Sequence, residues 1–231
     1  MVVERDLLIS LLKLTKDGPV LVETVNNDAK IASDIVIKLL ESLQKQGLVY
    51  LKNGFLKVDS DGRLMLAAKS VAMGADIERV SAFFSWQEFE EIATLALEKN
   101  GYAAVKNVRF KNEGKRWEID AVGCRKPLVL CVDCKHWRRG LKQSMLRRIV
   151  DAQVKRTRAL LNTLPAVSLK LECTKWKKAK FVPVILSLIP SNLKFYRDVP
   201  VVPILQLQDF LIQLPVQIES LKYFTKNFSH L

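Results

Sequence analysis

The sequence VLCVDCK, residues 129–135, ends an apolar run with an aspartate and a lysine. A second apolar run, WEIDAV at residues 117–122, contains Asp120, and a turn at residues 123–127 separates the two. We interpret both runs as adjacent strands joined by that turn. Side chains alternate along a strand, so Asp133 and Lys135 point to one face. Two carboxylates at the same level of neighbouring strands can bind one divalent cation, and charges on a buried strand are costly unless they have a role.

The composition indicates a globular protein with a real hydrophobic core. The chain has 231 residues, of which 49% are hydrophobic, which suits one large or two small domains. No apolar run is long enough to span a bilayer, and the first residues lack the pattern of a signal peptide. We therefore expect a cytoplasmic protein without membrane association, in which disulfides are not expected.

The sequence gives little support for a zinc site or for a nucleotide cofactor. Cys131 and Cys134 have Cys-x-x-Cys spacing, but in a strand this places the thiols on opposite faces, and no second Cys/His pair accompanies them. We interpret both as small core residues. A Gly-rich phosphate loop is also missing, so we expect no nucleotide cofactor.

The positive charge is concentrated in one part of the chain. The formal net charge is +13, yet residues 1–80 contain 11 Lys and Arg against 11 Asp and Glu. Residues 81–231 therefore hold 26 basic against 13 acidic residues. A basic region that also gathers a few acids at one site suits a polyanion substrate and a metal ion.

The first part of the chain predicts a small helical domain at residues 1–74. Apolar spacing and breakers predict helices at about 5–14, 20–26 and 33–46, the last with Ser33 as N-cap. A hairpin with an Asn-Gly turn at residues 53–54 follows, and then a helix that Asp59 or Ser60 caps. This order resembles a winged helix-turn-helix domain. Its third helix carries few basic residues, so DNA contact and dimerisation are equally open, and the wing is the better candidate for a phosphate contact.

The second part, residues 75–231, predicts a mixed sheet flanked by helices, an α/β fold. Ser85 and Glu88 form a capping box that opens a helix ending near Gly101. The other elements predicted are strands at 103–110, 180–188 and 199–204, a polar turn at 111–116, helices at 142–161 and 207–212, and a helical tail up to about Phe224.

An ordered set of short motifs lies on these elements: FEEIA at 89–93, GY at 101–102, EID at 118–120 and DCK at 133–135. This set resembles the PD-(D/E)XK nuclease superfamily, in the branch of Mrr-type restriction enzymes and archaeal Holliday-junction resolvases. The resemblance covers about residues 85–210 and implies a restriction-endonuclease-like fold. Ile119 stands where the family name has proline, and Asp133 takes the position of Asp or Glu.

The resemblance implies a DNA endonuclease that depends on Mg²⁺ or Mn²⁺. Asp120, Asp133 and the backbone carbonyl of Cys134 would bind the metal, with Glu90 completing the site directly or through water. Lys135 would orient or help to deprotonate the attacking water. A bound divalent ion supplies an activated water and neutralises phosphate charge.

Two neighbours of Glu90 compete for its role. Glu88 is explained by the capping box, and Glu91 lies one position off the family pattern. The relatives cleave with paired active sites, so the resemblance also implies a homodimer.

The predicted DNA contacts lie after the motif. A basic and aromatic loop follows Lys135, one face of the long helix is basic, and a second basic run contains a tryptophan. The expected nucleic-acid-binding residues are His136, Trp137, Arg138, Arg139, Arg147, Gln153, Lys155, Arg158, Lys177 and Lys178. Gln153 is included because it resembles a helix glutamine near the site in several relatives.

Two other functions remain open at this stage. The chain could be a nucleic-acid-binding or structural module with a vestigial nuclease site, although the four motif residues are all intact. It could also be an RNA-directed nuclease, because charge does not separate DNA from RNA.

Overall fold

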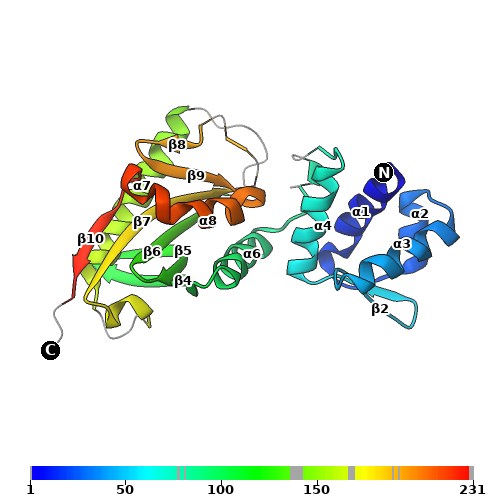
Figure 1. Cartoon of the computed structure of the whole chain (residues 1–231), viewed down its shortest axis with the longest axis horizontal. Helices are drawn as coiled ribbons and strands as arrows, with labels where there is room; N and C mark the ends of the chain where they lie inside the picture. The colour runs from blue at the N-terminus through cyan, green and yellow to red at the C-terminus, as the bar shows by residue number, and fades with distance from the viewer. Residues whose placement is uncertain are drawn as a thin grey trace. The chain divides into compact units, whose positions relative to one another are not determined.

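A computed structural model describes residues 2–76, 79–80, 82–135, 143–165, 170–188, 190–191 and 193–228 (Figure 1). The chain divides into two compact units, Met1–Glu88 and Phe89–Leu231. The expected domain boundary after residue 74 stays a prediction. No helix within the described residues is both long and apolar enough to cross a membrane.

The first unit contains the predicted order of three helices, a hairpin and a helix. Its short strands form one antiparallel sheet in the order β1-β3-β2. The winged-helix interpretation of this order stays a prediction. The elements are α1 (Val2–Leu14), β1 (Val20–Leu21), α2 (Val22–Ala29), α3 (Ser33–Lys45), β2 (Tyr50–Lys52), β3 (Phe55–Lys57) and α4 (Ser60–Ala72).

Helical spacing of apolar residues builds the core of this unit. In α1, Leu8 and Leu12 lie one turn apart and are fully buried. In α3, the buried residues Val36, Leu40 and Leu43 form one stripe at four- and three-residue spacing. The opposite side of α3 is exposed, so this helix buries one face.

Turns and caps end these elements largely as their residue types predict. Asn53 and Gly54 both have positive φ, 51° and 77°, as a tight hairpin turn requires. Asp59 caps α4 by accepting a 2.7 Å hydrogen bond from a backbone N–H three residues on. The expected cap at Ser33 is wrong, because Ser33 is the first helical residue and the cap position is Ala32, which makes no side-chain cap.

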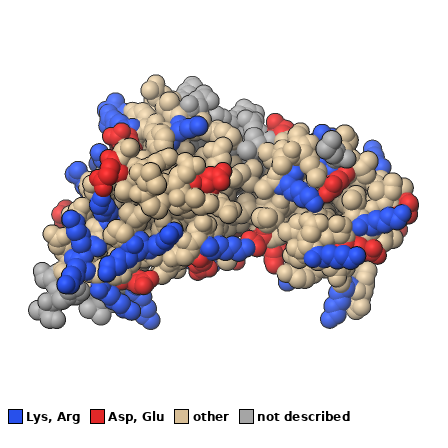
Figure 2. Space-filling view, viewed as in Figure 1, with Lys and Arg blue, Asp and Glu red and all other residues tan. Residues whose placement is uncertain are grey.

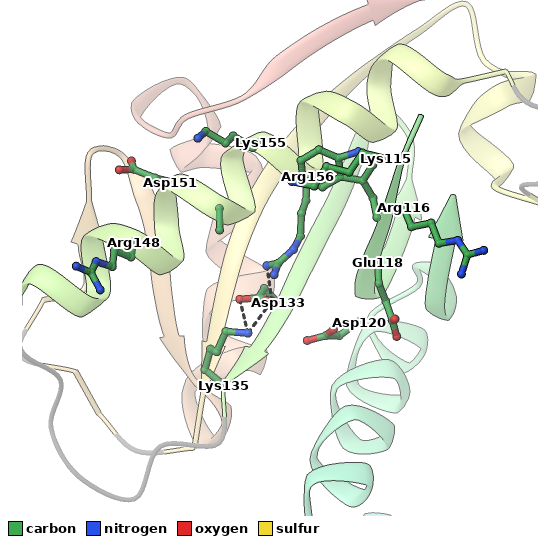
Figure 3. Close-up of a pocket in the computed structure, with 12 residues that line it drawn as sticks. Lys115, Arg116, Glu118, Asp120, Asp133, Lys135, Arg148, Asp151, Lys155 and Arg156 are labelled. Carbon is green, nitrogen blue, oxygen red and sulfur yellow. Dashed lines mark hydrogen bonds and ion pairs between the residues drawn. The ribbon is translucent and has the colours of Figure 1, made fainter. Parts of the chain in front are cut away.

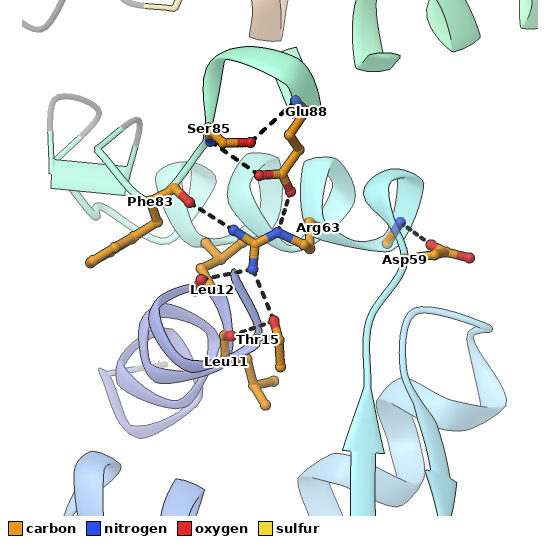
Figure 4. A network of polar contacts seen from close by, with 9 residues as sticks. Leu11, Leu12, Thr15, Asp59, Arg63, Phe83, Ser85 and Glu88 are labelled. Atoms are coloured by element: carbon orange, nitrogen blue, oxygen red, sulfur yellow. Dashed lines mark hydrogen bonds and ion pairs between the residues drawn. The ribbon is translucent and has the colours of Figure 1, made fainter. Parts of the chain in front are cut away.

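A buried arginine ties α1, α4 and the start of α6 (Trp86–Lys99) together. Arg63 is 3% exposed and forms an ion pair with Glu88. Its other nitrogens donate to the Leu12 carbonyl at 2.7 Å, Thr15 Oγ1 at 2.9 Å and the Phe83 carbonyl at 2.8 Å (Figure 4). Glu88 also forms the predicted capping box, in which Ser85 and Glu88 each accept a 3.2 Å hydrogen bond from the other's backbone N–H.

Within its described residues the second unit is built on a mixed seven-stranded sheet, so the expected α/β fold class is confirmed. The order is β4-β5-β6-β7-β9-β8, with β10 paired to β7 beside this path. The elements are β4 (Ala103–Asn112), β5 (Lys115–Arg125), β6 (Leu128–Lys135), α7 (Gln143–Thr163), β7 (Lys178–Ser187), β8 (Phe195–Tyr196), β9 (Val199–Pro203), α8 (Leu207–Gln217) and β10 (Phe224–Asn227).

Two predictions about this unit are wrong. Residues 111–116 are mostly strand, because the turn is confined to Glu113 and Gly114, whose φ values are 51° and 75°. The tail is not helical up to Phe224. Strand β10 begins there and pairs antiparallel with the first part of β7, a long-range partner that local periodicity does not reveal.

Helices cover both faces of the sheet (Figure 1). α7 crosses β4 to β7, and its Leu160 packs into a core with Val122, Cys131 and Phe181. On the other face α6 approaches β5 so closely that a Cβ on Gly123 would lie 3.2 Å from Leu97 side-chain carbons. Glycine at this point of β5 therefore permits the close helix–strand packing.

We expect Arg63→Met to lower the free energy of unfolding by about 3–5 kcal/mol, because it leaves the Glu88 carboxylate buried without its cation. Equilibrium urea unfolding followed by far-UV circular dichroism measures the change. The control is Lys13→Ala, which breaks an exposed ion pair with Asp28 and should cost less than about 1 kcal/mol. Equal losses in the two variants would contradict a structural role for the Arg63 network.

Candidate active site

Strands β5 and β6 separate at the level of the two aspartates. They pair from Arg125 and Leu128 up to Ala121 and Val132. Beyond this point residues 133–135 pair with β7, whereas residues 115–119 of β5 pair with β4. The strands therefore form a fork with Asp120 on one arm and Asp133 on the other.

The backbone of β5 is irregular at this fork. Ile119 and Val122 are three residues apart, yet both pack into the core beneath α7. Because a regular strand places such residues on opposite faces, the alternation shifts between them, where Asp120 lies. The neighbouring residue of β4, Asn107, has a φ of 53° and is skipped in the pairing.

Asp133 is a buried carboxylate held by two cations. Its side chain is 3% exposed, and Lys135 Nζ lies 2.8 Å from an oxygen. Arg156 from α7 places Nη1 2.9 Å from Oδ1 (Figure 3). A buried carboxylate is tolerated when cations compensate it in this way. Asp133 Oδ2 accepts no well-directed hydrogen bond within the described residues, although the Lys135 ammonium lies beside it.

Asp120 is held across the fork. Its Oδ2 accepts a 2.7 Å hydrogen bond from the backbone N–H of Cys134. Burial, and then the negative charge of Asp133, raise the pKa of Asp120 to about 6, while that hydrogen bond opposes the rise. Asp120 is therefore ionised at neutral pH, although burial and the charge of Asp133 disfavour its ionised form.

The fork opens into a cleft of about 740 Å³ between β5, β6 and α7 (Figure 3). Asp120, Asp133 and Lys135, which were predicted as a set, all line it. Among the described lining residues six are basic and four are acidic, so cations surround the carboxylates. The described lining residues are Lys115, Arg116, Trp117, Glu118, Asp120, Asp133, Lys135, Arg148, Asp151, Ala152, Lys155 and Arg156.

The two aspartates fit a divalent cation as a partial ligand set. Asp133 Oδ2 has lone pairs that no well-directed hydrogen bond within the described residues uses, and both aspartates line the cleft. Hard cations such as Mg²⁺ prefer these oxygens and commonly keep several waters. Within the described part of the chain, no three His, Cys, Asp or Glu residues form a cluster that could hold a metal.

Glu90 does not complete such a cluster in this structure. It is on α6, outside the cleft lining, although its charge contributes to raising the pKa of Asp120. Glu88, its first competitor, is engaged by Arg63 and the capping box. The metal role of Glu90 and its preference over Glu91 stay predictions.

The segment that holds Asp120, Asp133 and Lys135 is similar to known proteins. A model of the Mrr catalytic domain, described as restriction endonuclease, matches residues 82–168. An uncharacterized protein of Archaeoglobus fulgidus is 31% identical over 130 residues, which are 56% of this chain and 91% of that protein. Residues 82–168 thus match the restriction endonuclease family. The match supports the expected PD-(D/E)XK superfamily and assigns an endonuclease domain to the segment that holds the fork.

Two solved structures are similar to this chain over different shares of its length. One is a protein of unknown function with 20% identity and a TM-score of 0.26, matched over 42% of this chain and 44% of its own. The other, from Vibrio cholerae, has 13% identity and a TM-score of 0.37, matched over 95% of this chain and 52% of its own. The chain thus spans about half the length of these solved proteins.

The predicted DNA contacts on α7 divide into exposed and buried residues. Lys155 lines the cleft. Arg147 lies 3.7 Å from Asp151, and the Arg158 guanidinium lies 4.8 Å from the Phe224 ring centre. Gln153 is 0% exposed, so the prediction that it contacts nucleic acid is wrong.

Gln153 instead supports the strand behind the site. Its Nε2 donates a 2.6 Å hydrogen bond to the Cys131 carbonyl on β6. The residue is buried because α7 packs directly against the sheet at this point. Helical spacing alone puts Gln153 at the edge of the apolar stripe of α7 and does not decide whether it is exposed.

The remaining predicted contacts lie away from the cleft or outside the described residues. His136, Trp137, Arg138 and Arg139 belong to the part of the chain that the structure does not describe. Lys177 and Lys178 are exposed at the start of β7 and do not line the cleft. On the face seen in Figure 2, Lys and Arg side chains gather at the end of this unit where Figure 1 draws β4 and β10.

Four basic residues of the cleft were not among the predicted site residues: Arg156, Arg148, Lys115 and Arg116. Arg156 lies three residues after Gln153, so helical spacing offered a signal that it shares the inward-facing side of α7. Lys115 and Arg116 were assigned to a turn, whereas they extend β5 past the fork.

We expect Asp120→Asn to stabilise the metal-free protein at neutral and alkaline pH. Because the folded-state pKa is raised from 3.8 to about 6, the protonated form is favoured and stability is lost as pH rises through that range. In EDTA the variant should gain about 1–2 kcal/mol at about pH 8, after discounting for partial exposure, and almost nothing near pH 4.

Thermal unfolding of both proteins across this pH range measures the difference. Asp209→Asn, at an exposed position on α8, is the control and should show no such pH-dependent gain. A constant gain at all pH values would show that the ionised Asp120 is not its origin.

Proposed function

We propose that the cleft at the fork of β5 and β6 hydrolyses DNA phosphodiester bonds with a bound Mg²⁺ or Mn²⁺ ion. The observation that carries the proposal is the meeting of Asp120, Asp133 and Lys135 at one fork, inside a basic cleft. The endonuclease family of this segment supports the same reaction class.

The aspartates and the Cys134 carbonyl would hold the cation, with Glu90 acting through water from α6. A divalent cation bound there supplies a water of lowered pKa and neutralises charge on the phosphate. Asp120 must lose its proton to take part, and its raised pKa of about 6 means that it does so below neutral pH. Metal binding then favours the carboxylate form further.

The two cations next to Asp133, Lys135 and Arg156, would have different roles. Lys135 presents its ammonium beside Asp133, where it can turn to the scissile phosphate and to the attacking water. Arg156 holds Asp133 from the α7 side, so the carboxylate keeps its orientation when Lys135 turns away. Arg156 is therefore a positioning residue in this mechanism.

A nucleic acid is the proposed substrate because the cleft is basic, and the restriction endonuclease match of residues 82–168 favours DNA. Arg148 and Lys155 lie on the α7 wall of the cleft, and phosphate contacts of this type supply most of the sequence-independent affinity. The residue 1–74 segment could add a DNA contact or a dimer contact, as its sequence left open. A homodimer remains part of the proposal and is measured by light scattering of the full chain.

The test is cleavage of labelled duplex, branched and single-stranded DNA, with RNA of the same sequences, in Mg²⁺, Mn²⁺, Ca²⁺ or EDTA. We expect cutting in Mg²⁺ or Mn²⁺ and none in EDTA. Asp133→Ala and Lys135→Ala should each lower the rate by roughly 10²–10⁴-fold, because each removes a group that acts at the reacting phosphate.

Asp209→Ala removes a carboxylate at an exposed position on α8 and should cut like the unmodified protein. Binding of DNA without metal-dependent cutting would favour the alternative of a binding module. Faster cutting of RNA would favour the RNA-directed nuclease, and activity that survives Asp133→Ala would reject the assigned site.

A further inference from the structure

A second cleft shares a wall with the candidate active site. Its volume is about 820 Å³, within the range of roughly 300–1,000 Å³ usual for ligand sites. Arg116, Trp117 and Glu118 line both clefts. The second cleft is completed by Arg109, Phe110, Lys111 and Thr163, and it contains neither aspartate of the fork.

The hairpin of β4 and β5 forms this second cleft. β5 leaves β6 at the fork, so residues 115–119 continue with β4 as their strand partner. This two-stranded extension packs on the end of α7, where Phe110 joins the core with Leu160 and Leu164. The second cleft is therefore attached rigidly to the same elements that position Asp120.

The charges of the second cleft suit an anionic ligand. The charged residues in the described part of its lining are three cations and Glu118. Arg109 Nε lies 3.2 Å from Glu118, which balances that acid. Within the described residues, Lys111 and Arg116 have no such ion pair, so their charges are available to phosphates.

Its aromatic residues suit a flat ring. Trp117 is partly buried, packs beside the core and lies on the common wall. The ammonium of Lys115 lies 4.2 Å from its ring centre, a cation–π contact. The indole Nε1 is covered and donates no hydrogen bond within the described residues.

We propose that the second cleft receives an unpaired nucleotide of the DNA strand next to the scissile phosphate. Its base packs against Trp117 and Phe110, and its phosphates contact Lys111 and Arg116. The proposal rests on the proposed function, because the fork defines which phosphate is cut. A base inside a duplex cannot reach a side cleft without leaving the stack. The expected substrates are therefore single strands, flaps or bulges, ahead of perfect duplex DNA.

The test uses the full chain and an abasic scan. The cut is first mapped on a single-stranded or bulged oligonucleotide in Mg²⁺, and an abasic site is then placed at each position around it. We expect affinity in Ca²⁺ and the cutting rate to fall about ten-fold at one position beside the cut, the effect of losing one stacked base. Trp117→Phe should keep this position-specific loss, whereas Trp117→Leu should bind weakly and lack it.

A surface pair keeps the test decisive if Trp117→Leu fails to fold. Lys111→Glu should weaken binding of the bulged strand several-fold. Lys106→Glu, on the same strand but lining neither cleft, should change it less.

The second-cleft proposal would be overturned if Lys111→Glu and Lys106→Glu weakened binding equally. It would also be overturned if no abasic position changed affinity or cutting rate and duplex DNA were cut as fast as bulged DNA. DNA hydrolysis at the fork would then stand. No metal-dependent cutting of any DNA would overturn both proposals.

Discussion

The separation of β5 from β6 is the constraint on which the site depends. If the strands continued to pair, Asp120 and Asp133 would be cross-strand neighbours, and like charges in that position repel. At the fork each carboxylate has its own partner, the Cys134 N–H for one and the two cations for the other. The separation also creates the open volume into which both acids project. Packing of β5, β6 and α7 thus decides where the charges can lie.

The site contains unfavourably buried carboxylates whose cost neighbouring cations partly offset. Asp133 is nearly inaccessible to water, and Asp120 is ionised at neutral pH only against its raised pKa. Such arrangements cost stability in the resting protein, and they persist at functional sites because preorganised charges act strongly where water is excluded. Arg156 and Lys135 reduce the cost by pairing with Asp133. They also leave the cleft close to neutral around its centre and basic at its margins.

Local chemistry made much of the fold predictable. The Asn-Gly turn and the Ser85–Glu88 box involve residues close in sequence, so their patterns were sufficient. The meeting of Asp120 with Asp133 was also predictable, because one short turn joins their strands. Arg156 meets Asp133 only through the packing of α7 across the sheet, and β10 meets β7 across more than 40 residues. Contacts of this kind depend on tertiary packing that periodicity does not encode.

The helix α6 has consequences for dissecting the chain. Its capping turn lies in the first compact unit, and Glu90 and the rest of its length lie in the second. A fragment beginning at residue 75 would keep the capping box but lose Arg63, the cation that Glu88 pairs with. A fragment that contains only the nuclease segment would therefore lack an interaction that the full chain provides. Grafting it behind another domain would require a new partner for the first turn of α6, or a helix start that carries no buried acid.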